Sequence, residues 1–327
     1  MVKNIKASLL STSAQGWLER TKTARILSIF HRCCNLINQD DDILSLVTPD
    51  IGPGPFSIVL DINGKLENAW VFPEDLVPGL EGRVEQSRIY LGSIVVDTVE
   101  VDRWEASLRW DDLFQKRDLI LSKAYQLACL LLEMAPPASL AEVVTSNILN
   151  DPEERDLPAF QLSITDRWTL AAIQYISVLK NAIWDDQCFS CDEAVRSLAG
   201  LGSGLTPSGD DFIIGILYAL RIVFPKEVAK QLVDRICRVA AAQTHLLSAA
   251  YIHAAAHGEA IWIWHSLLDA MISSNTSHFR QVIRQFLLIG HTSGIDALAG
   301  FVQILCEHEI AKADPICTSK NDKLGSA

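Results

Sequence analysis

The sequence contains no uninterrupted apolar run of the roughly 20 residues that a transmembrane helix requires. The apolar stretches at residues 127–132 and 261–264 end at Glu133 and His265, long before that length is reached. The first residues also lack the continuous apolar segment and the small-residue cleavage site of a secretory signal. We therefore predict a cytoplasmic protein without a membrane span.

Positive charge is scarce. The chain has 28 Lys and Arg against 40 Asp and Glu, which gives a formal net charge of −12. Nucleic acid and anionic membrane surfaces are not attracted to an acidic protein, so we expect neither as a partner. A hydrophobic content of 49% with 21% charged residues is typical of a folded globular protein, and 327 residues suffice for two domains.

Several catalytic signatures are missing: no Walker loop, Rossmann fingerprint or G-x-S-x-G elbow occurs. The eight cysteines are scattered through a chain too large to need disulfides, so we expect free thiols. The one CxxC is formed by Cys188 and Cys191. A zinc site there would need two more ligands, and a redox motif would need a βαβ context, so packing or a helix start is the favoured explanation.

Residues 1–115 are predicted to form a β-rich domain. Apolar residues alternate over residues 25–36 and 43–48 on either side of an acidic turn at 40–42, which predicts a hairpin. Further strands are expected at 56–61 and 87–101, turns at 50–55, 63–64 and 81–82, and a short helix near 16–25. Short strands at this spacing are typical of a small barrel or curled sheet.

From Trp104 onward the apolar period becomes 3.6, which predicts an all-α domain over residues 116–327 and an α+β fold class overall. A polar connector is expected at 151–158 and a frayed polar tail after Ala313. The expected helices cover residues 113–134, 139–150, 165–184, 191–199, 208–223, 226–242, 244–257, 259–273, 277–288 and 293–308.

A glycine-rich loop, G-L-G-S-G-L-T-P-S-G-D-D at residues 200–211, leads directly into an apolar run that begins at Phe212. Ser208 is predicted to be the N-cap of this helix, with Asp211 three positions on as in a capping box. A helix start does not require four glycines. Glycines are useful where backbone N–H groups approach a ligand closely, which makes this loop the first candidate for a binding site.

The pattern S-G-x-D-x-φ-x-G-φ-φ occurs twice, at residues 208–217 and 293–302, and predicts a serine N-cap for each helix, Ser208 and Ser293. Each copy carries a glycine inside its helix, Gly215 and Gly300, where glycine costs about 1 kcal/mol relative to alanine. We therefore predict that each helix packs closely against the other. The two copies are then either well-capped, close-packed helices or two helix starts that converge on a phosphate or carboxylate.

On the second hypothesis, His291 and Asp210 are the candidate catalytic residues. His291 lies just before the second Ser-Gly pair and suits an acid or electrophile beside a bound anion. Asp211 and Asp296 are explained mainly as capping carboxylates, whereas Asp210 corresponds to Ile295 and is left for chemistry or for a cation. No metal and no cofactor is predicted. The candidate substrate-binding residues lie in the two helix starts: Gly204, Thr206, Ser208, Gly209, Asp211, Ser293, Gly294 and Asp296.

Two further sets of residues lie at helical spacing. Thr244, Ser248, Tyr251 and Ala255 form a strip of mostly small residues that either lines the same cavity or permits a helix crossing. His253 and His257 share a helix face with a spacing that metal ligands use, but no third ligand is evident. The alternatives there are a solvated or capping pair and the centre of a metal-dependent hydrolase.

Together, G-L-G-S-G-L-T-P-S-G-D-D-F at residues 200–212 and G-H-T-S-G-I-D-A-L-A-G-F at 290–301 resemble a bacterial family. It is the family of the small subunit of the three-component oxamate carbamoyltransferase, which acts in allantoin degradation within purine catabolism. The resemblance covers the C-terminal domain well and the N-terminal strands more loosely.

The resemblance implies a transferase subunit that takes part in the phosphorolysis of oxalurate to oxamate and carbamoyl phosphate, or in the reverse reaction. It also implies a hetero-oligomer with two larger subunits and a small anionic substrate. Asp210 would then orient or deprotonate the amide nitrogen, and His291 would stabilise the developing oxyanion. The alternative is a non-catalytic metabolite-binding or scaffolding subunit.

Overall fold

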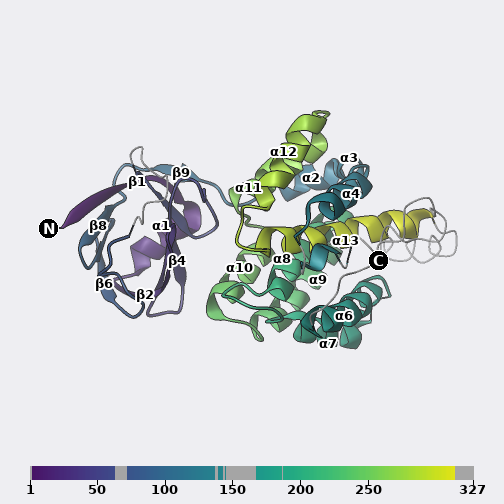
Figure 1. The fold of residues 1–327 in the computed structure, drawn as a ribbon, viewed down its shortest axis with the longest axis horizontal. Coiled ribbons are helices and arrows are strands. Elements are labelled where there is room, and N and C mark those ends of the chain that lie inside the picture. Colours follow the sequence, from purple (N-terminus) through teal and green to yellow (C-terminus); the bar gives the residue numbers. More distant parts are fainter. Residues whose placement is uncertain are drawn as a thin grey trace. The chain divides into compact units, whose positions relative to one another are not determined.

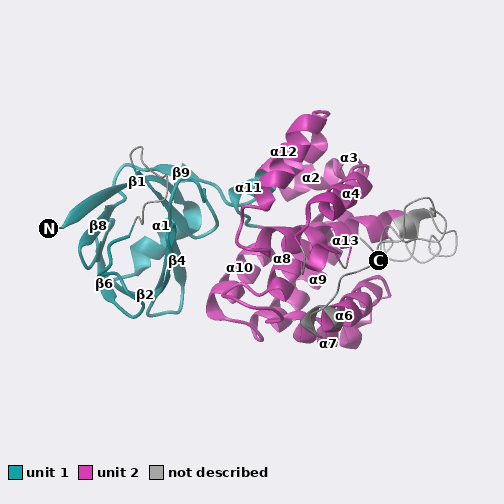
Figure 2. Cartoon of the chain, in the orientation of Figure 1, with its two compact units in different colours: residues 1–108, 259–265 teal, residues 109–258, 266–327 magenta. Residues whose placement is uncertain are grey.

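The computed structural model describes residues 2–62, 72–136, 139–142, 144, 167–185 and 187–313. The chain divides into two compact units, residues 1–108 with 259–265 and residues 109–258 with 266–327 (Figure 2). The first unit is rich in strands and the second is helical (Figure 1), so the predicted α+β fold class is confirmed. The predicted turn at 63–64, connector at 151–158 and tail lie outside the described residues, as does most of the predicted helix at 139–150.

The strands of the first unit form one sheet that closes on itself (Figure 1). Eight strands form a ring in the order β5-β4-β3-β2-β6-β7-β8-β1, which closes because β1 also pairs antiparallel with β5. The predicted small barrel is therefore confirmed. The strands are β1 (Lys3–Ser11), β2 (Thr23–Ile29), β3 (Cys33–Asn38), β4 (Ile43–Val47), β5 (Ser57–Leu60), β6 (Glu81–Glu85), β7 (Arg88–Leu91), β8 (Ile94–Asp97) and β9 (Asp102–Trp104).

The turn predicted at residues 81–82 is wrong, because these residues open strand β6. Gly82 is required there by a close approach: a Cβ atom at this position would lie 2.6 Å from the backbone oxygen of Tyr90 on the neighbouring strand β7. Strand β9 pairs in parallel with the end of β1, beyond the residues that pair with β8.

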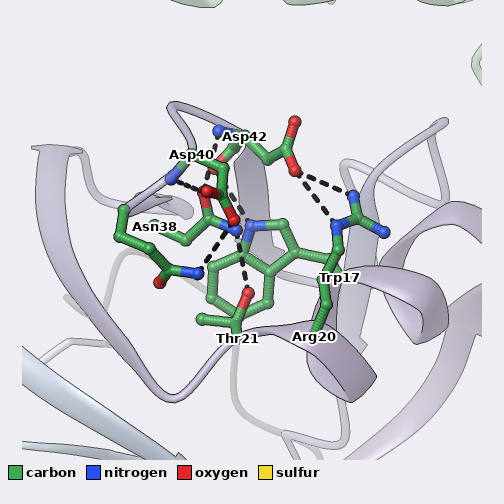
Figure 3. A network of polar contacts seen from close by, with 7 residues as sticks. Trp17, Arg20, Thr21, Asn38, Asp40 and Asp42 are labelled. Atoms are coloured by element: carbon green, nitrogen blue, oxygen red, sulfur yellow. Dashed lines mark hydrogen bonds and ion pairs between the residues drawn. The ribbon is translucent and has the colours of Figure 1, made fainter.

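Helix α1 (Thr12–Arg20) begins four residues earlier than predicted, because the hydroxyl of Ser11 accepts a hydrogen bond from the backbone N–H of Ala14. Trp17 is 1% exposed and packs in the barrel core. Its indole N–H donates to the backbone oxygen of Asp42 at 3.0 Å, and the Arg20 guanidinium pairs with the Asp42 carboxylate (Figure 3). These contacts fasten α1 to the β3–β4 hairpin.

Asn38, at the end of β3, is buried beside this helix (Figure 3). Its side-chain amide donates to the hydroxyl of Thr21 at 2.9 Å, and its carbonyl accepts from the backbone N–H groups of Asp40 and Asp42. A buried amide satisfied in this way fixes the acidic turn that the sequence predicts at residues 40–42.

Residues 259–265, which follow most of the helices in sequence, belong to the first unit. The backbone N–H of Ala260 donates to Ala106 at 2.9 Å, and the Trp262 indole donates to the backbone oxygen of Ile51 at 2.8 Å. Gly52 has a positive φ of 76°, and any side chain there would overlap the Trp262 ring. The glycine in the predicted 50–55 turn therefore makes room for a segment from far along the chain.

The second unit is built around α8, in which every residue except Arg221 is buried. Helices α13, α9, α10 and α2 pack against it. No helix in the described ranges is both long and apolar enough to span a membrane. The helices are α2 (Trp110–Gln115), α3 (Arg117–Leu121), α4 (Ala124–Met134), α6 (Arg167–Trp184), α7 (Cys188–Leu198), α8 (Ser208–Val223), α9 (Lys226–Ala241), α10 (Leu246–Ala256), α11 (Trp262–Ile272), α12 (Thr276–Phe286) and α13 (Ser293–Ala313).

The single helix predicted over residues 113–134 is wrong, because the chain forms α2, α3 and α4 instead. The breaks fall at Lys116 and near Lys123, where ψ shifts to 13° and 0°. The ammonium of Lys123 donates to the backbone oxygens of Ala270 and Ser273, at the end of α11. The change in ψ at each break is small, so the apolar residues keep a period close to 3.6 across it. The sequence pattern therefore does not reveal the breaks.

Candidate functional site

The two S-G-x-D segments begin α8 and α13, and these helices cross at their glycines. A Cβ atom at Gly215 would overlap the backbone oxygen of Ala297, and one at Gly300 would overlap that of Phe212. Phe212 and Ala297 occupy the same position in the two copies of the pattern, so the contacts are reciprocal. The prediction that each helix is the close-packed partner of the other is confirmed.

The prediction that Ser208 and Ser293 are N-caps is wrong. Pro207 is the N-cap of α8, and Ser208 is the first helical residue. Likewise, the backbone N–H of Asp296 donates to the backbone oxygen of Thr292 at 2.8 Å, so Ser293 is already helical and each helix begins one residue earlier than a serine N-cap would place it. A capping box cannot form at α8, because the N-cap residue Pro207 has no backbone N–H to donate to a carboxylate.

The serine hydroxyls instead face the other helix. Ser208 Oγ lies 3.4 Å from Thr292 Oγ1, and Ser293 Oγ lies 3.2 Å from Thr206 Oγ1. The four hydroxyls therefore bring the two helix starts together, as the hypothesis of two converging helix starts requires. The positive ends of two helix dipoles lie at this cluster, which we call the hydroxyl cluster. Ser208 is buried, whereas Thr206, Thr292 and Ser293 are partly exposed.

Asp211 and Asp296 lie next to the hydroxyl cluster and are 7% and 0% exposed. Burial raises the pKa of Asp211 well above its ordinary value, and the charges of Asp296 and Asp210 raise it further, while a hydrogen bond from Ser293 opposes the rise. Burial likewise raises the pKa of Asp296 to about 6, against hydrogen bonds from Ser208, Thr292 and the Leu140 backbone. For each aspartate, one hydroxyl that opposes the rise in pKa comes from the other helix: Ser293 for Asp211, and Ser208 for Asp296.

Each of these two carboxyls has one buried oxygen, Oδ2, without a hydrogen-bond partner in the part of the chain that the structure describes. Buried carboxyl oxygens are normally satisfied, so each exception requires an explanation. Capping does not provide one, since neither residue caps its own helix.

Asp210, which the sequence left without a capping role, is fully buried and accepts three hydrogen bonds. Its Oδ1 accepts from the backbone N–H of Gly200 at 2.8 Å, and its Oδ2 accepts from Ser248 at 2.7 Å and from Thr244. Asp210 therefore ties the start of the glycine loop to α10. It also explains Thr244 and Ser248 of the strip predicted from the sequence.

The glycines of the two helix starts are mainly packing positions. The N–H of Gly209 donates to Leu201 at 2.8 Å and that of Gly294 donates to Ile289 at 3.3 Å, so both are used within the chain. Side chains at these positions would overlap the backbone oxygens of Leu198 and Phe286.

Gly204 and His291 are the two exposed members of the predicted site. Gly204 has a φ of 97° and no atom within 4 Å of where a Cβ would lie, so it needs glycine for its backbone angle alone. His291 is close enough to Asp296 to lower the pKa of that carboxyl. His291, which precedes Thr292 of the hydroxyl cluster in the chain, is thus the exposed titratable residue beside it.

His253 and His257 lie elsewhere in the unit, on α10. They line a cavity of about 500 Å³ between α9 and α10, together with Asp234, Cys237 and Arg238. His253 Nδ1 lies 3.3 Å from Cys237 Sγ, and His257 Nδ1 lies 2.7 Å from the backbone oxygen of His253. Among the described residues, no three His, Cys, Asp or Glu side chains are placed to hold one metal ion.

The CxxC cysteines lie in the first turn of α7, where Cys188 is exposed, Cys191 is buried and neither forms a disulfide within the described residues. This position agrees with the favoured explanation of a helix start. The sequence reasoning missed Thr292 and Leu140 as members of the site. Thr292 has a usable signal, since it aligns with Pro207 in the repeated pattern, whereas the backbone of Leu140 has none.

Residues 198–305 match the family model described as Oxamate carbamoyltransferase subunit AllH, and residues 3–107 match the AllH family N-terminal domain. No curated protein and no solved structure gives a significant match. The matched segments cover most of the chain, and the first contains both copies of the pattern with the hydroxyl cluster. The chain therefore belongs to the AllH family of oxamate carbamoyltransferase subunits.

Proposed function

We propose that this chain is the subunit of oxamate carbamoyltransferase that binds the phosphate or carboxylate group of the substrate, at the paired starts of α8 and α13. The observation that carries the proposal is the hydroxyl cluster, in which Ser208 meets Thr292 and Thr206 meets Ser293. The positive ends of two helix dipoles favour an anion there, and the hydroxyl protons of the cluster can rotate to donate to it.

The proposed reaction is the transfer of a carbamoyl group between oxamate and phosphate, within a complex that includes larger partner subunits. In the phosphorolysis direction, a phosphate oxygen attacks the carbamoyl carbon of oxalurate and the bond from that carbon to the amide nitrogen breaks. The proton that phosphate loses goes to the nitrogen, which leaves as the amide of oxamate. His291, at the exposed side of the cluster, is the residue we assign to stabilising the carbonyl oxygen as negative charge develops.

Asp210 receives a different role from the one that sequence reasoning suggested. Both of its oxygens are occupied by donors from Gly200, Thr244 and Ser248, so we assign it to positioning the glycine loop instead of to proton transfer. The same observation favours a second candidate function, a subunit that binds the anion as a sensor or scaffold while another subunit carries out the chemistry.

Phosphate binding to the isolated full-length chain, measured by isothermal titration calorimetry, tests the anion site. We expect Ser208→Ala and Ser293→Ala each to weaken binding by about tenfold, since a hydrogen bond to a charged group contributes about 1.5 kcal/mol or more. Ser277→Ala, an exposed serine at the start of α12, is the matched control and should bind phosphate as the unchanged chain does. Equal binding by all variants would refute the site.

Carbamoyl transfer by the complex reconstituted with its partner subunits separates the two candidate functions. If His291 stabilises the oxyanion, His291→Ala lowers kcat by about a hundredfold while phosphate still binds. If the chain is a sensor or scaffold, the same variant leaves kcat unchanged.

A further inference from the structure

The carboxyl pair formed by Asp211 and Asp296 is the feature that the proposed function leaves unexplained. Both side chains are more than nine-tenths buried, and each keeps a buried Oδ2 without a partner among the described residues. None of the ion pairs found in that part of the chain includes either carboxyl. A buried carboxylate without compensation is unstable, so the pair needs a proton or a cation.

The proposed anion site makes this requirement stronger. The hydroxyls of Ser208 and Ser293 that line the site also hydrogen-bond to the carboxyls of Asp296 and Asp211. A phosphate bound at the hydroxyl cluster would therefore lie near two more negative groups and be repelled by them. A proton on one carboxyl would remove one charge only. A cation between the carboxyls would partner both Oδ2 atoms and attract the anion as well.

The available ligand atoms indicate which cation. The carboxyl pair and the hydroxyl cluster offer only oxygen atoms, from Asp211, Asp296 and the four Ser and Thr side chains. Oxygen ligands without sulfur or imidazole suit hard cations such as Mg²⁺ or Mn²⁺ and not zinc. Mg²⁺ in particular is commonly held by one or two carboxylates together with water and the phosphate of a substrate.

We propose that Asp211 and Asp296 together bind one divalent cation of the Mg²⁺ class between the starts of α8 and α13, and that this cation contacts the bound phosphate. The second part of the proposal rests on the proposed function, and the first part does not. The cation would act as the electrostatic link between two carboxylates and an anion that otherwise repel one another.

The test uses the full-length chain, stripped of metal with a chelator, and Mn²⁺ as a spectroscopic probe. Electron paramagnetic resonance of free Mn²⁺ should show one bound ion per chain, displaced by excess Mg²⁺. Asp211→Asn and Asp296→Asn should each weaken Mn²⁺ binding by about tenfold or more. Asp192→Asn, which removes the carboxyl that pairs with Arg235 in the same unit, is the control and should leave Mn²⁺ binding unchanged.

The unchanged chain alone can overturn the proposal, if it binds no Mn²⁺ at millimolar concentration with or without phosphate. Mn²⁺ binding that survives in both Asn variants, once circular dichroism shows that they are folded, also overturns it. Phosphate affinity that is equal with and without Mg²⁺ would refute the contact between cation and phosphate but leave the anion site intact. Mn²⁺ bound at the pair in a chain that never binds phosphate would refute the proposed function instead.

Discussion

The two copies of the S-G-x-D pattern begin two helices that cross, yet they are built differently around the crossing. The positions they share make the contacts: Gly215 and Gly300 each meet backbone of the other helix, and Ser208 and Ser293 each lie beside a threonine hydroxyl of the other segment. The aspartates they share, Asp211 and Asp296, form the carboxyl pair.

The positions that differ serve only one copy. Asp210 in the first copy is buried and holds the glycine loop to α10, whereas its counterpart Ile295 is buried as an apolar core residue. The first helix follows a long loop in which Gly200, Gly202 and Gly204 all have positive φ, and the second follows a turn with Gly290 alone. The repeated positions therefore identify the contact between α8 and α13 and the residues both helices bring to it. The position that departs from the repeat, Asp210, identifies the residue that holds the glycine loop.

The largest expected effect comes from breaking the glycine contact. Gly215→Ala and Gly300→Ala should each lower the free energy of unfolding of the helical unit by about 3 kcal/mol, because the added methyl group overlaps backbone that cannot rotate away. Denaturant unfolding followed by circular dichroism measures this. Because the contact is reciprocal, the two losses should be similar, and the double variant should cost less than their sum.

Gly16→Ala in α1 is the matched control, since its methyl group would meet only the flexible end of the Arg20 side chain at 3.2 Å. We expect this variant to be as stable as the original chain or more stable, by up to about 1 kcal/mol. A large loss at Gly215 with none at Gly300 would contradict the reciprocal packing.

The next effect separates the two adjacent aspartates. Asp210→Asn should destabilise the helical unit by about 2 kcal/mol, because the amide keeps the shape but cannot accept from Gly200, Thr244 and Ser248 together. Cleavage of residues 200–207 by a protease should become faster. Asp211→Asn in metal-free buffer should instead leave stability unchanged or raised, since it replaces a buried carboxyl that is costly to ionise and has an oxygen without a partner among the described residues. Equal losses at both positions would show that the carboxyl pair stabilises the fold.

The smallest expected effect tests whether the two hydroxyl contacts of the cluster stabilise the helical unit equally. Ser208→Ala and Ser293→Ala should each cost about 1 kcal/mol of unfolding free energy, the net value of one hydrogen bond. Thermal unfolding monitored by differential scanning calorimetry can resolve a difference of this size. A loss at one serine only would mean that one of the two hydroxyl contacts does not form in solution.

The sequence predicts β4, β5, β7, β8 and most helices because burial on one face imposes a period that the chain repeats locally. It does not identify β1, and it joins β2 and the start of β3 into one stretch at residues 25–36. It fails where neighbouring segments decide the outcome. The breaks at Lys116 and Lys123 keep the helical period, and Gly82 looks like a turn residue until β7 is placed beside it. His253 of α10 lies beside Cys237 of α9 at the cavity between these helices. The spacing of the histidines along the chain does not reveal this contact.

For the candidate site, the sequence by itself determined the family, the repeated pattern and the close packing of α8 on α13, because two internal glycines in matching positions are costly unless another backbone approaches them. Only the tertiary structure decided what the aspartates do. Adjacent residues on a helix point in different directions, so Asp210 faces donors on α10 while Asp211 faces Asp296. The first carboxylate is fully satisfied, and the second keeps an oxygen without a partner among the described residues. The repeated pattern separates the two positions but does not say what either carboxylate contacts.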